Sequence, residues 1–257
     1  MQNDERRRVS HRMSAATWES LAKKDPWRAV LTSVDGSVAA GDVEARDAFY
    51  RSGEAYLERI LAAIRAHIGL ADHFETAADF GCGVGRVAVP LARLCGELIA
   101  VDVSATMLSL TAEHASRQGV GNVVLQKGED FVADRRGLDL LHSVIVLQHI
   151  WPEEGFRILA AVLPRMRPGG VVVLHVPYHV GGERARLPFR WARSRIPGCN
   201  AVANMLRGRP AKEPYMQMNA YDLNRLVALL HQHGFGDLFL LDEPQGEVRG
   251  VIVIAKR

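Results

Sequence analysis

The sequence has few of the residues and spacings that mark disulfide-rich or metal-binding proteins. Its three cysteines, Cys82, Cys95 and Cys199, are odd in number and widely spaced, which argues against a secreted disulfide framework. It contains no CxxC pair, and its one HxxxH pair, His175 and His179, is predicted at a strand end rather than on a helix. We therefore expect no disulfide staple and no zinc site.

Long apolar runs are also missing. No run approaches the roughly 18 apolar residues that a membrane span requires. The segment MQNDERRRVSHRM carries charge but lacks the apolar stretch of a signal peptide. The 257 residues, 48% of them hydrophobic, suffice to bury a full core. These features predict a cytoplasmic protein without a membrane span, and they leave its oligomeric state open.

Charge is nearly balanced over the whole chain but not along it. The net charge is +3. The segment 181–212 carries one acid, Glu183, and eight basic residues, so it contributes +7 and the remainder sums to −4. The basic residues are Arg184, Arg186, Arg190, Arg193, Arg195, Arg207, Arg209 and Lys212. A local basic excess of this kind indicates an anionic partner or substrate.

The apolar pattern divides the chain into two parts. Residues 1–43 form a polar arm with few apolar anchors, and Asp25-Pro26 argues against one long helix there. Residues 44–68 show helical spacing of Leu57, Ile60, Leu61, Ile64 and Ile68. We expect residues 1–70 to be an amino-terminal cap with a helix, and residues 71–257 to be the main domain.

The main domain alternates between strand and helix patterns. Strands are predicted at 77–80, 97–103, 122–126, 138–144 and 171–176, and helices at 87–94, 104–116, from Pro152, and at 221–231 after an Asn219 cap. Such alternation is typical of a parallel sheet with helices on both faces. Two last strands, 237–241 and 251–255, are joined by only nine residues and should be antiparallel neighbours.

The most informative segment is a glycine-rich loop between the first strand and the first helix of this domain. It reads Asp79-Phe80-Gly81-Cys82-Gly83-Val84-Gly85, a D-x-G-x-G-x-G pattern. Glycines allow sharp turns and close approach of a ligand to the backbone. The dinucleotide fingerprint GxGxxG requires glycine where this chain has Arg86. The loop therefore favours a nucleotide-like ligand and disfavours a nicotinamide cofactor.

This loop and the motifs after it resemble those of the class I S-adenosylmethionine (SAM)-dependent methyltransferases. Asp102 follows 17 residues after Gly85 in AVDVSATML, QKGEDF follows the third strand, and RPGGVVVLHV holds the fifth. The resemblance covers about residues 75–180 by motif and 219–257 by topology. It implies an α/β fold: a three-layer α/β/α, Rossmann-like methyltransferase fold, with a mostly parallel sheet and an antiparallel last strand. The implied cofactor is SAM.

The resemblance also implies roles for individual residues. Asp102 would bind both ribose hydroxyls. Glu129 or Asp130 would lie near the adenine amino group, and Val103 and Met107 would contact the adenine faces. Backbone N–H groups of the loop at Gly81, Gly83 and Gly85 would hold the methionine end, Asp79 would support the loop and the ligand's amino group, and Arg51 would pair with its carboxylate.

Candidate acceptor-side residues follow the later strands. His149, just after the fourth strand, is the candidate proton acceptor for a hydroxyl or amine. His142 is expected to be a packed residue. The inserted basic segment 181–215 is expected to be a lid over the acceptor site. A plain solvated surface is the competing interpretation for that segment.

The predicted function is methyl transfer from SAM to a small or medium acceptor, with an acidic acceptor favoured by the basic segment. Three alternatives remain open. These are an RNA methyltransferase, a non-catalytic SAM-binding scaffold, and a nicotinamide-dependent oxidoreductase. Nucleic acid is the less favoured partner, because no separate binding domain is visible and the Asn/Asp-Pro-Pro-Tyr/Phe motif is absent after the fourth strand.

Overall fold

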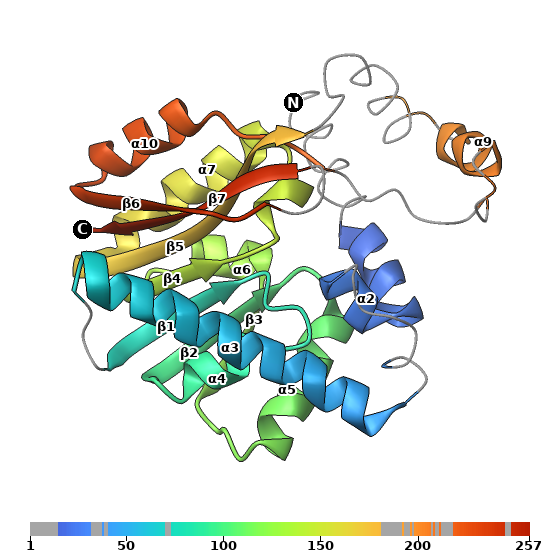
Figure 1. Cartoon of the computed structure of the whole chain (residues 1–257), viewed down its shortest axis with the longest axis horizontal. Coiled ribbons are helices and arrows are strands. Elements are labelled where there is room, and N and C mark those ends of the chain that lie inside the picture. The colour runs from blue at the N-terminus through green and yellow to red at the C-terminus, as the bar shows by residue number, and fades with distance from the viewer. Residues whose placement is uncertain are drawn as a thin grey trace.

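In the described part of the chain, seven strands form one sheet in the order β3-β2-β1-β4-β5-β7-β6 (Figure 1). This computed structural model describes residues 15–31, 38, 41–69, 73–180, 192, 196, 198–206, 208, 211, 218–244 and 248–257. The strands are β1 (Phe74–Phe80), β2 (Cys95–Asp102), β3 (Val123–Lys127), β4 (Leu138–Ser143), β5 (Met166–Val180), β6 (Asp237–Asp242) and β7 (Val248–Lys256).

Helices cover both faces of this sheet. Residues 15–24 are helical and precede α2 (Pro26–Val30) and α3 (Val43–His67). The remaining described helices are α4 (Ala88–Ala92), α5 (Ala105–Arg117), α6 (Gly128–Ala133), η1 (Leu147–His149), α7 (Pro152–Val162), η2 (Leu163–Arg165), α9 (Cys199–Met205) and α10 (Leu223–Gln232).

The topology confirms the predicted three-layer, mostly parallel architecture. Strands β1 to β5 pair in parallel, and β7 is antiparallel to both β5 and β6. Among the strands of this sheet, β7 alone is therefore antiparallel to the others. The short connection between β6 and β7 left no room for a crossover helix, which is why the sequence could predict the reversal.

Two local expectations were wrong. Asn219 is not the cap of the last helix, because α10 begins at Leu223 and the carboxylate of Asp222 accepts from the N–H groups of Asn224 and Arg225. The fifth strand starts at Met166 rather than 171, and its pairing with β4 shifts register between Leu138 and Leu140. The Pro-Gly-Gly sequence thus produces a bulge inside a strand rather than a break before it.

Apolar side chains form one core on each face of the sheet. On one face, Phe131, Leu159 and Leu226 from α6, α7 and α10 pack against the strands. On the other face, α3 lies across the sheet (Figure 1), and Leu57, Ile60, Leu61 and Ile64 pack with strand residues. Burying each such side chain contributes about 1.5–3 kcal/mol. The stripe on α3 therefore joins the amino-terminal segment to the main sheet, as its spacing predicted; the domain boundary near residue 70 stays a prediction.

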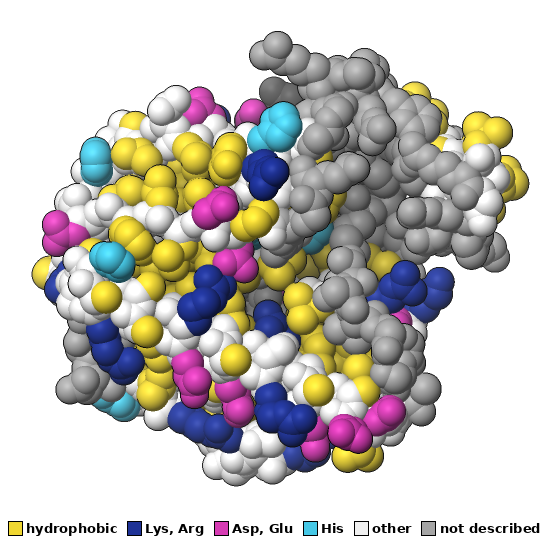
Figure 2. Space-filling model, in the orientation of Figure 1, with side chains coloured by type: hydrophobic (Ala, Val, Ile, Leu, Met, Phe, Trp, Pro, Cys, Tyr) yellow, Lys and Arg dark blue, Asp and Glu magenta, His cyan; other side chains and the backbone are white. Residues whose placement is uncertain are grey.

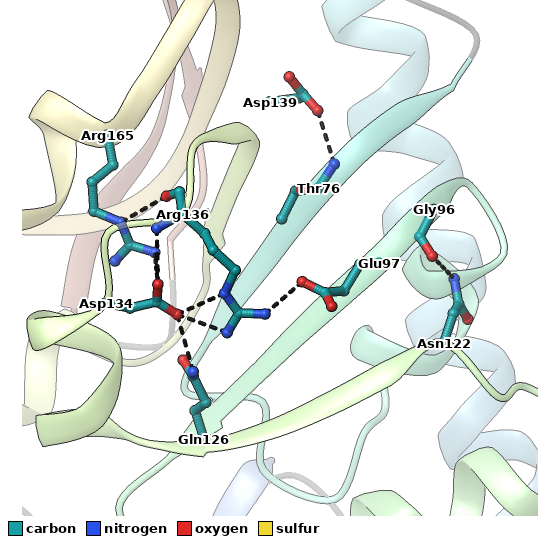
Figure 3. A network of polar contacts seen from close by, with 9 residues as sticks. All are labelled: Thr76, Gly96, Glu97, Asn122, Gln126, Asp134, Arg136, Asp139 and Arg165. Atoms are coloured by element: carbon teal, nitrogen blue, oxygen red, sulfur yellow. Dashed lines mark hydrogen bonds and ion pairs between the residues drawn. The ribbon is translucent and has the colours of Figure 1, made fainter.

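Charged side chains of the loop before β4 form hydrogen bonds and ion pairs with the neighbouring strands β2 and β3 (Figure 3). Asp134 accepts hydrogen bonds from Arg136 and Gln126, and Arg136 also reaches Glu97 on β2. These contacts hold the pKa of the Asp134 carboxyl well below its usual range, chiefly through Arg136. The network lies away from the glycine loop, so its role is to support the sheet.

Asp139, the acid at the start of β4, joins that strand to β1. Its Oδ2 atom accepts from the backbone N–H groups of Glu75 and Thr76, both at 2.8 Å, and Arg167 lies 2.9 Å from the same atom. Asp139 is therefore a structural hydrogen-bond acceptor.

We expect Asp139→Ala to lower the free energy of unfolding by about 1–3 kcal/mol, because two backbone donors lose their acceptor. Urea denaturation measures this change. Glu75→Gln is the control: it removes only an ion pair with Arg167 from a side chain that is 80% exposed, so its effect should be near zero. Equal stability of the two variants would contradict the account.

Candidate functional site

The glycine loop lies where the carboxyl ends of β1 and β2 meet. Asp79 and Phe80 of β1 pair with Ala100 and Val101 of β2, so the loop after β1 lies beside the end of β2. In open α/β sheets, ligands bind at this edge, and here β1 lies between β2 and β4, where the strand order reverses. Residues of these loops are therefore the candidates for a binding site.

The glycines of the loop adopt backbone conformations that favour glycine. Gly81, Gly83 and Gly85 have φ values of 85°, 56° and 81°. A Cβ atom on Gly81 would also lie 2.1 Å from Cγ2 of Val146, in the loop after β4. The sequence pattern therefore identified a real constraint, because L side chains are strained at such φ values.

The backbone N–H groups of the loop have partners within the protein. Those of Gly81 and Cys82 donate to the Val101 carbonyl, and that of Gly85 donates to the Cys82 carbonyl. These bonds fold the loop onto the end of β2. The implied contacts of Gly81, Gly83 and Gly85 with a ligand stay a prediction, and the loop's observed donors serve its own geometry.

Asp102 connects the loop to the helix that follows β2. Its Oδ2 atom accepts from Gly83 N–H at 3.0 Å, and its Oδ1 atom accepts from Ser104 N–H at 2.9 Å. Burial raises the pKa of this carboxyl to about 6, although these N–H donors act in the opposite direction. A carboxylate at the end of β2, beside the loop, has the chemistry to accept two hydroxyl groups of a ribose.

Two side chains that the sequence did not single out as ligands support the loop. Thr111 on α5 donates its hydroxyl to the Gly83 carbonyl at 2.8 Å, and the Cys82 thiol lies 3.7 Å from that hydroxyl. Burial raises the pKa of the Cys82 thiol well above its usual value. Cys82 is therefore a packing residue, and its thiol is poorly suited to act as a nucleophile.

The predicted adenine-side residues lie around the end of β2, in two different environments. Glu129 and Asp130 are exposed in the first turn of α6, which follows β3 directly. Val103 is half-buried, and a Cβ atom on Gly128 would lie 3.5 Å from it. Met107 is 3% exposed and packs in a cluster with apolar residues of the amino-terminal segment.

The amino-terminal segment contacts the start of α5. Glu19 accepts hydroxyl hydrogen bonds from Ser104 and Thr106, each at 2.7 Å, and an N–H bond from Thr106. These bonds lower the pKa of Glu19 to about 2, and the bond from Ser104 has the largest effect. Val30 packs directly against Gly83, because a Cβ atom on Gly83 would lie 2.7 Å from Cγ2 of Val30. The segment therefore covers the carboxyl end of the sheet near the loop (Figure 1).

His149 lies in the short helix η1, which follows the loop after β4. It is 7% exposed, its Nε2 atom is 3.2 Å from the Gln148 amide nitrogen, and its ring meets that of Trp18 edge-on at 4.9 Å. Two later residues fix the same turn. Asn219 donates its amide to the carbonyls of Gln148 and Ile150, and Tyr221 donates its hydroxyl to Ile150.

Ile145, in the loop after β4, has a φ of 63° and is the one non-glycine residue with positive φ in the described part of the chain. A β-branched residue is strained in that conformation, and strain of this kind is common at functional sites. No sequence pattern predicts this conformation. Its place between His142 and His149 makes this loop part of the candidate site.

The two arginines near the loop, Arg51 and Arg86, lie in different environments. Arg51 is exposed on α3. Arg86 is 7% exposed, donates to the Ser52 hydroxyl at 3.3 Å, and lies over the rings of Phe49 and Tyr56. Burial lowers the pKa of its guanidinium. The assignment of Arg51 to a ligand carboxylate stays a prediction, and Arg86 is the buried cation of this region.

Asp79 is buried at the end of β1 and contacts a histidine. Its Oδ1 atom lies 2.7 Å from Nδ1 of His142, and Nε2 of that ring lies 3.2 Å from the hydroxyl of Tyr56. His142 is thus packed, as expected, but it is also hydrogen-bonded to a motif residue.

Other classes of site find little support among the described residues. No group of three or more His, Cys, Asp or Glu side chains there could hold a metal ion. On the face that carries α3, acidic and basic side chains are interspersed (Figure 2).

All eight basic residues of 181–212 lie outside the described residues, so the lid expected at 181–215 stays a prediction. No helix in the described ranges has the length and apolar character to cross a membrane.

Comparison with known proteins supports the resemblance. A family model described as a methyltransferase domain matches residues 77–170. A ubiquinone biosynthesis O-methyltransferase of Parvibaculum lavamentivorans is 28% identical over 97 residues, which are 37% of this chain and 38% of that protein. A trans-aconitate 2-methyltransferase of Deinococcus radiodurans is 33% identical over 102 residues, 38% of this chain and 36% of that protein. The matches thus span well under half of these relatives.

The fold agrees over a longer range. The structure of magnesium protoporphyrin IX methyltransferase from Synechocystis PCC 6803, solved with bound S-adenosylhomocysteine (SAH), covers 95% of this chain and 99% of its own, with a TM-score of 0.62 and 16% identity. At that identity the likeness concerns the fold. Fold, motif order and family model agree on residues 77–170, which contain Asp79, the glycine loop and Asp102. Residues 77–170 therefore match a methyltransferase domain, and the chain as a whole has the fold of the SAM-dependent methyltransferases.

Proposed function

We propose that the chain transfers a methyl group from SAM to a small or medium-sized acceptor that carries an anionic group. The observation that carries the proposal is Asp102: a carboxylate at the end of β2, fixed by N–H groups of Gly83 and Ser104 beside the glycine loop. SAM supplies an already activated methyl group on a sulfonium. The protein then contributes mainly proximity and orientation, and it needs neither a metal nor a nucleophile.

The proposed roles of the cofactor-side residues follow from their places. Asp102 accepts the two ribose hydroxyls, replacing hydrogen bonds that its oxygens otherwise accept from the loop. Glu129 or Asp130, exposed next to the end of β2, accepts from the adenine amino group. Val103 contacts the ring, and Met107 does so from the cluster beneath the amino-terminal segment. Asp79 receives the ligand's ammonium, and Arg51 its carboxylate.

The acceptor class rests on the basic segment 181–212. The relatives are named for ubiquinone biosynthesis and for trans-aconitate, and their matches cover only 37–38% of this chain. A net charge of +7 over 32 residues favours a carboxylate or phosphate acceptor. RNA is the second candidate for such a charge. A non-catalytic SAM-binding protein is the third.

Isothermal calorimetry tests the cofactor. We expect SAM and SAH to bind with micromolar dissociation constants and NAD to show no binding. Asp102→Ala should weaken SAH binding tenfold or more, or about 1.4 kcal/mol upward, because the ribose loses its acceptor. Wild-type affinity in the variant would remove Asp102 from the site.

Turnover tests the acceptor. SAH release should be faster with small carboxylates or phosphates than with their neutral esters, and it should fall as salt screens the basic segment. Equal rates with charged and neutral members of each pair would contradict an anionic acceptor. Turnover of RNA but not of small acids would favour the RNA alternative.

The pKa of Asp102 predicts a pH dependence of cofactor binding. Because burial raises that pKa to about 6, the free protein holds a proton there below pH 6. Ribose hydroxyls favour the charged carboxylate, so the ligand must displace that proton. SAH affinity should therefore rise with pH up to about 6 and level off above it.

Calorimetry across pH 4.5–8 measures this profile, and Asp102→Asn is its control, since an amide cannot titrate. The variant should bind more weakly at pH 8 and show a flat profile around pH 6. A bend near pH 6 that persists in Asp102→Asn would assign the titration to another group.

His149 is the proposed proton acceptor on the acceptor side. It lies on the turn after β4, held there by Asn219 and Tyr221 through the neighbouring carbonyls. We expect His149→Asn to lower kcat by about 10²–10⁴-fold while SAH affinity changes less than twofold, because general base catalysis is of that size. Asn219→Ala should reduce kcat less. A kcat within twofold of wild type for His149→Asn would show that the histidine is structural.

A further inference from the structure

Three side chains from different elements form a hydrogen-bonded chain beneath α3. Asp79 lies at the end of β1 and His142 on β4, and these are 3% and 2% exposed. Tyr56 lies on α3, outside the segment that the family model matches. The distances are 2.7 Å from Asp79 Oδ1 to His142 Nδ1 and 3.2 Å from His142 Nε2 to the Tyr56 hydroxyl.

The chemistry of these groups sets the direction of the hydrogen bonds. A bare lone pair on Nδ1 would face a carboxylate oxygen at 2.7 Å, so Nδ1 carries the hydrogen and donates it to Asp79. A phenol hydroxyl has one hydrogen to donate, and Nε2 of the Nδ1–H tautomer is the acceptor within reach. Burial raises the pKa of Tyr56, which keeps that hydrogen in place. The chain thus runs from Tyr56 through His142 to Asp79.

The carboxylate of Asp79 can accept further hydrogen bonds. Among the described residues, its carboxylate is hydrogen-bonded only to His142, through Oδ1, and the charge of the buried Arg86 interacts with it without a direct ion pair. A buried carboxylate is costly unless a cation or several donors compensate it. The ammonium group of an amino-acid tail supplies both a charge and donors for Oδ2.

The position of α3 is also fixed at this point. A Cβ atom on Gly53 would lie 2.1 Å from the backbone oxygen of Arg86, so the helix packs directly on the end of the glycine loop. Tyr56 follows Gly53 by three residues and therefore lies on the same side of α3. Close packing at Gly53 thus places the Tyr56 hydroxyl against His142.

We propose that His142 and Tyr56 are positioning residues that hold Asp79 for the amino-acid end of the cofactor, an inference that rests on the proposed function. His142 occupies Oδ1 and fixes the rotation of the carboxylate, which leaves Oδ2 for the ligand ammonium. Tyr56 fixes the tautomer of His142. Neither residue need touch the ligand, and the adenosine end of the site does not depend on them.

Two ligands separate this role from a general structural one. SAH carries the amino-acid tail, whereas 5′-methylthioadenosine keeps the adenosine and the thioether but lacks the tail. Calorimetry of both ligands with wild type and variants therefore reports the tail contact as a ratio of affinities. Tyr56→Phe should weaken SAH binding about three- to tenfold and leave methylthioadenosine binding within twofold.

Two substitutions of His142 should weaken SAH binding to different degrees. His142→Leu removes the donor to Asp79 and should weaken SAH binding tenfold or more. His142→Asn keeps an N–H donor near the position of Nδ1, so it should recover most of that loss. Tyr50→Phe is the matched control on the same helix and should change neither affinity. The Tyr50 ring stacks on the ring of His114, with the two centroids 3.6 Å apart, and not on the chain that includes His142.

The outcomes are distinct. Equal losses for both ligands, or no loss for SAH, in Tyr56→Phe and His142→Leu would overturn the positioning role alone. Wild type that binds neither ligand would refute the proposed function and this inference with it. If His142→Leu fails to fold, as its melting temperature would show, the comparison of SAH and methylthioadenosine binding to Tyr56→Phe carries the test.

Discussion

The carboxylate of Asp102 is the constraint on which the candidate site depends. It accepts one N–H from the glycine loop and one from the start of α5, so both segments are fixed to the end of β2. Burial disfavours the charge and raises the pKa of Asp102, while the two donors favour it. The proposed ribose contact rests on this position of the carboxylate beside the glycine loop.

Around this carboxylate the protein supports the site from elements far apart in sequence. Thr111 of α5 holds the Gly83 carbonyl, Glu19 of the amino-terminal segment binds Ser104 and Thr106, and Tyr56 of α3 reaches His142. The amino-terminal residues lie outside the segment that the family model matches. Residues of the matched segment and of the amino-terminal segment therefore form the candidate site together.

The sequence predicted the fold and the loop because their signals are local. Glycines at 81, 83 and 85 are demanded by positive φ, the acid at 102 ends a strand, and the short link before β7 forces an antiparallel pair. The sequence could not predict that His142 binds Asp79 or that Glu19 binds Thr106, because these pairs are 63 and 87 residues apart. Nor did it show that Ile145 is strained or that Asp222, not Asn219, caps α10, since both depend on the packed structure.

A crystal structure of the wild-type protein with bound SAH tests the central claim most directly. The account predicts both ribose hydroxyls within hydrogen-bonding distance of the Asp102 carboxylate, with the adenine near Val103 and the first turn of α6. It also predicts that Oδ2 of Asp79 faces the amino-acid end of the ligand. SAH bound with its ribose away from Asp102, or at another edge of the sheet, would contradict the account.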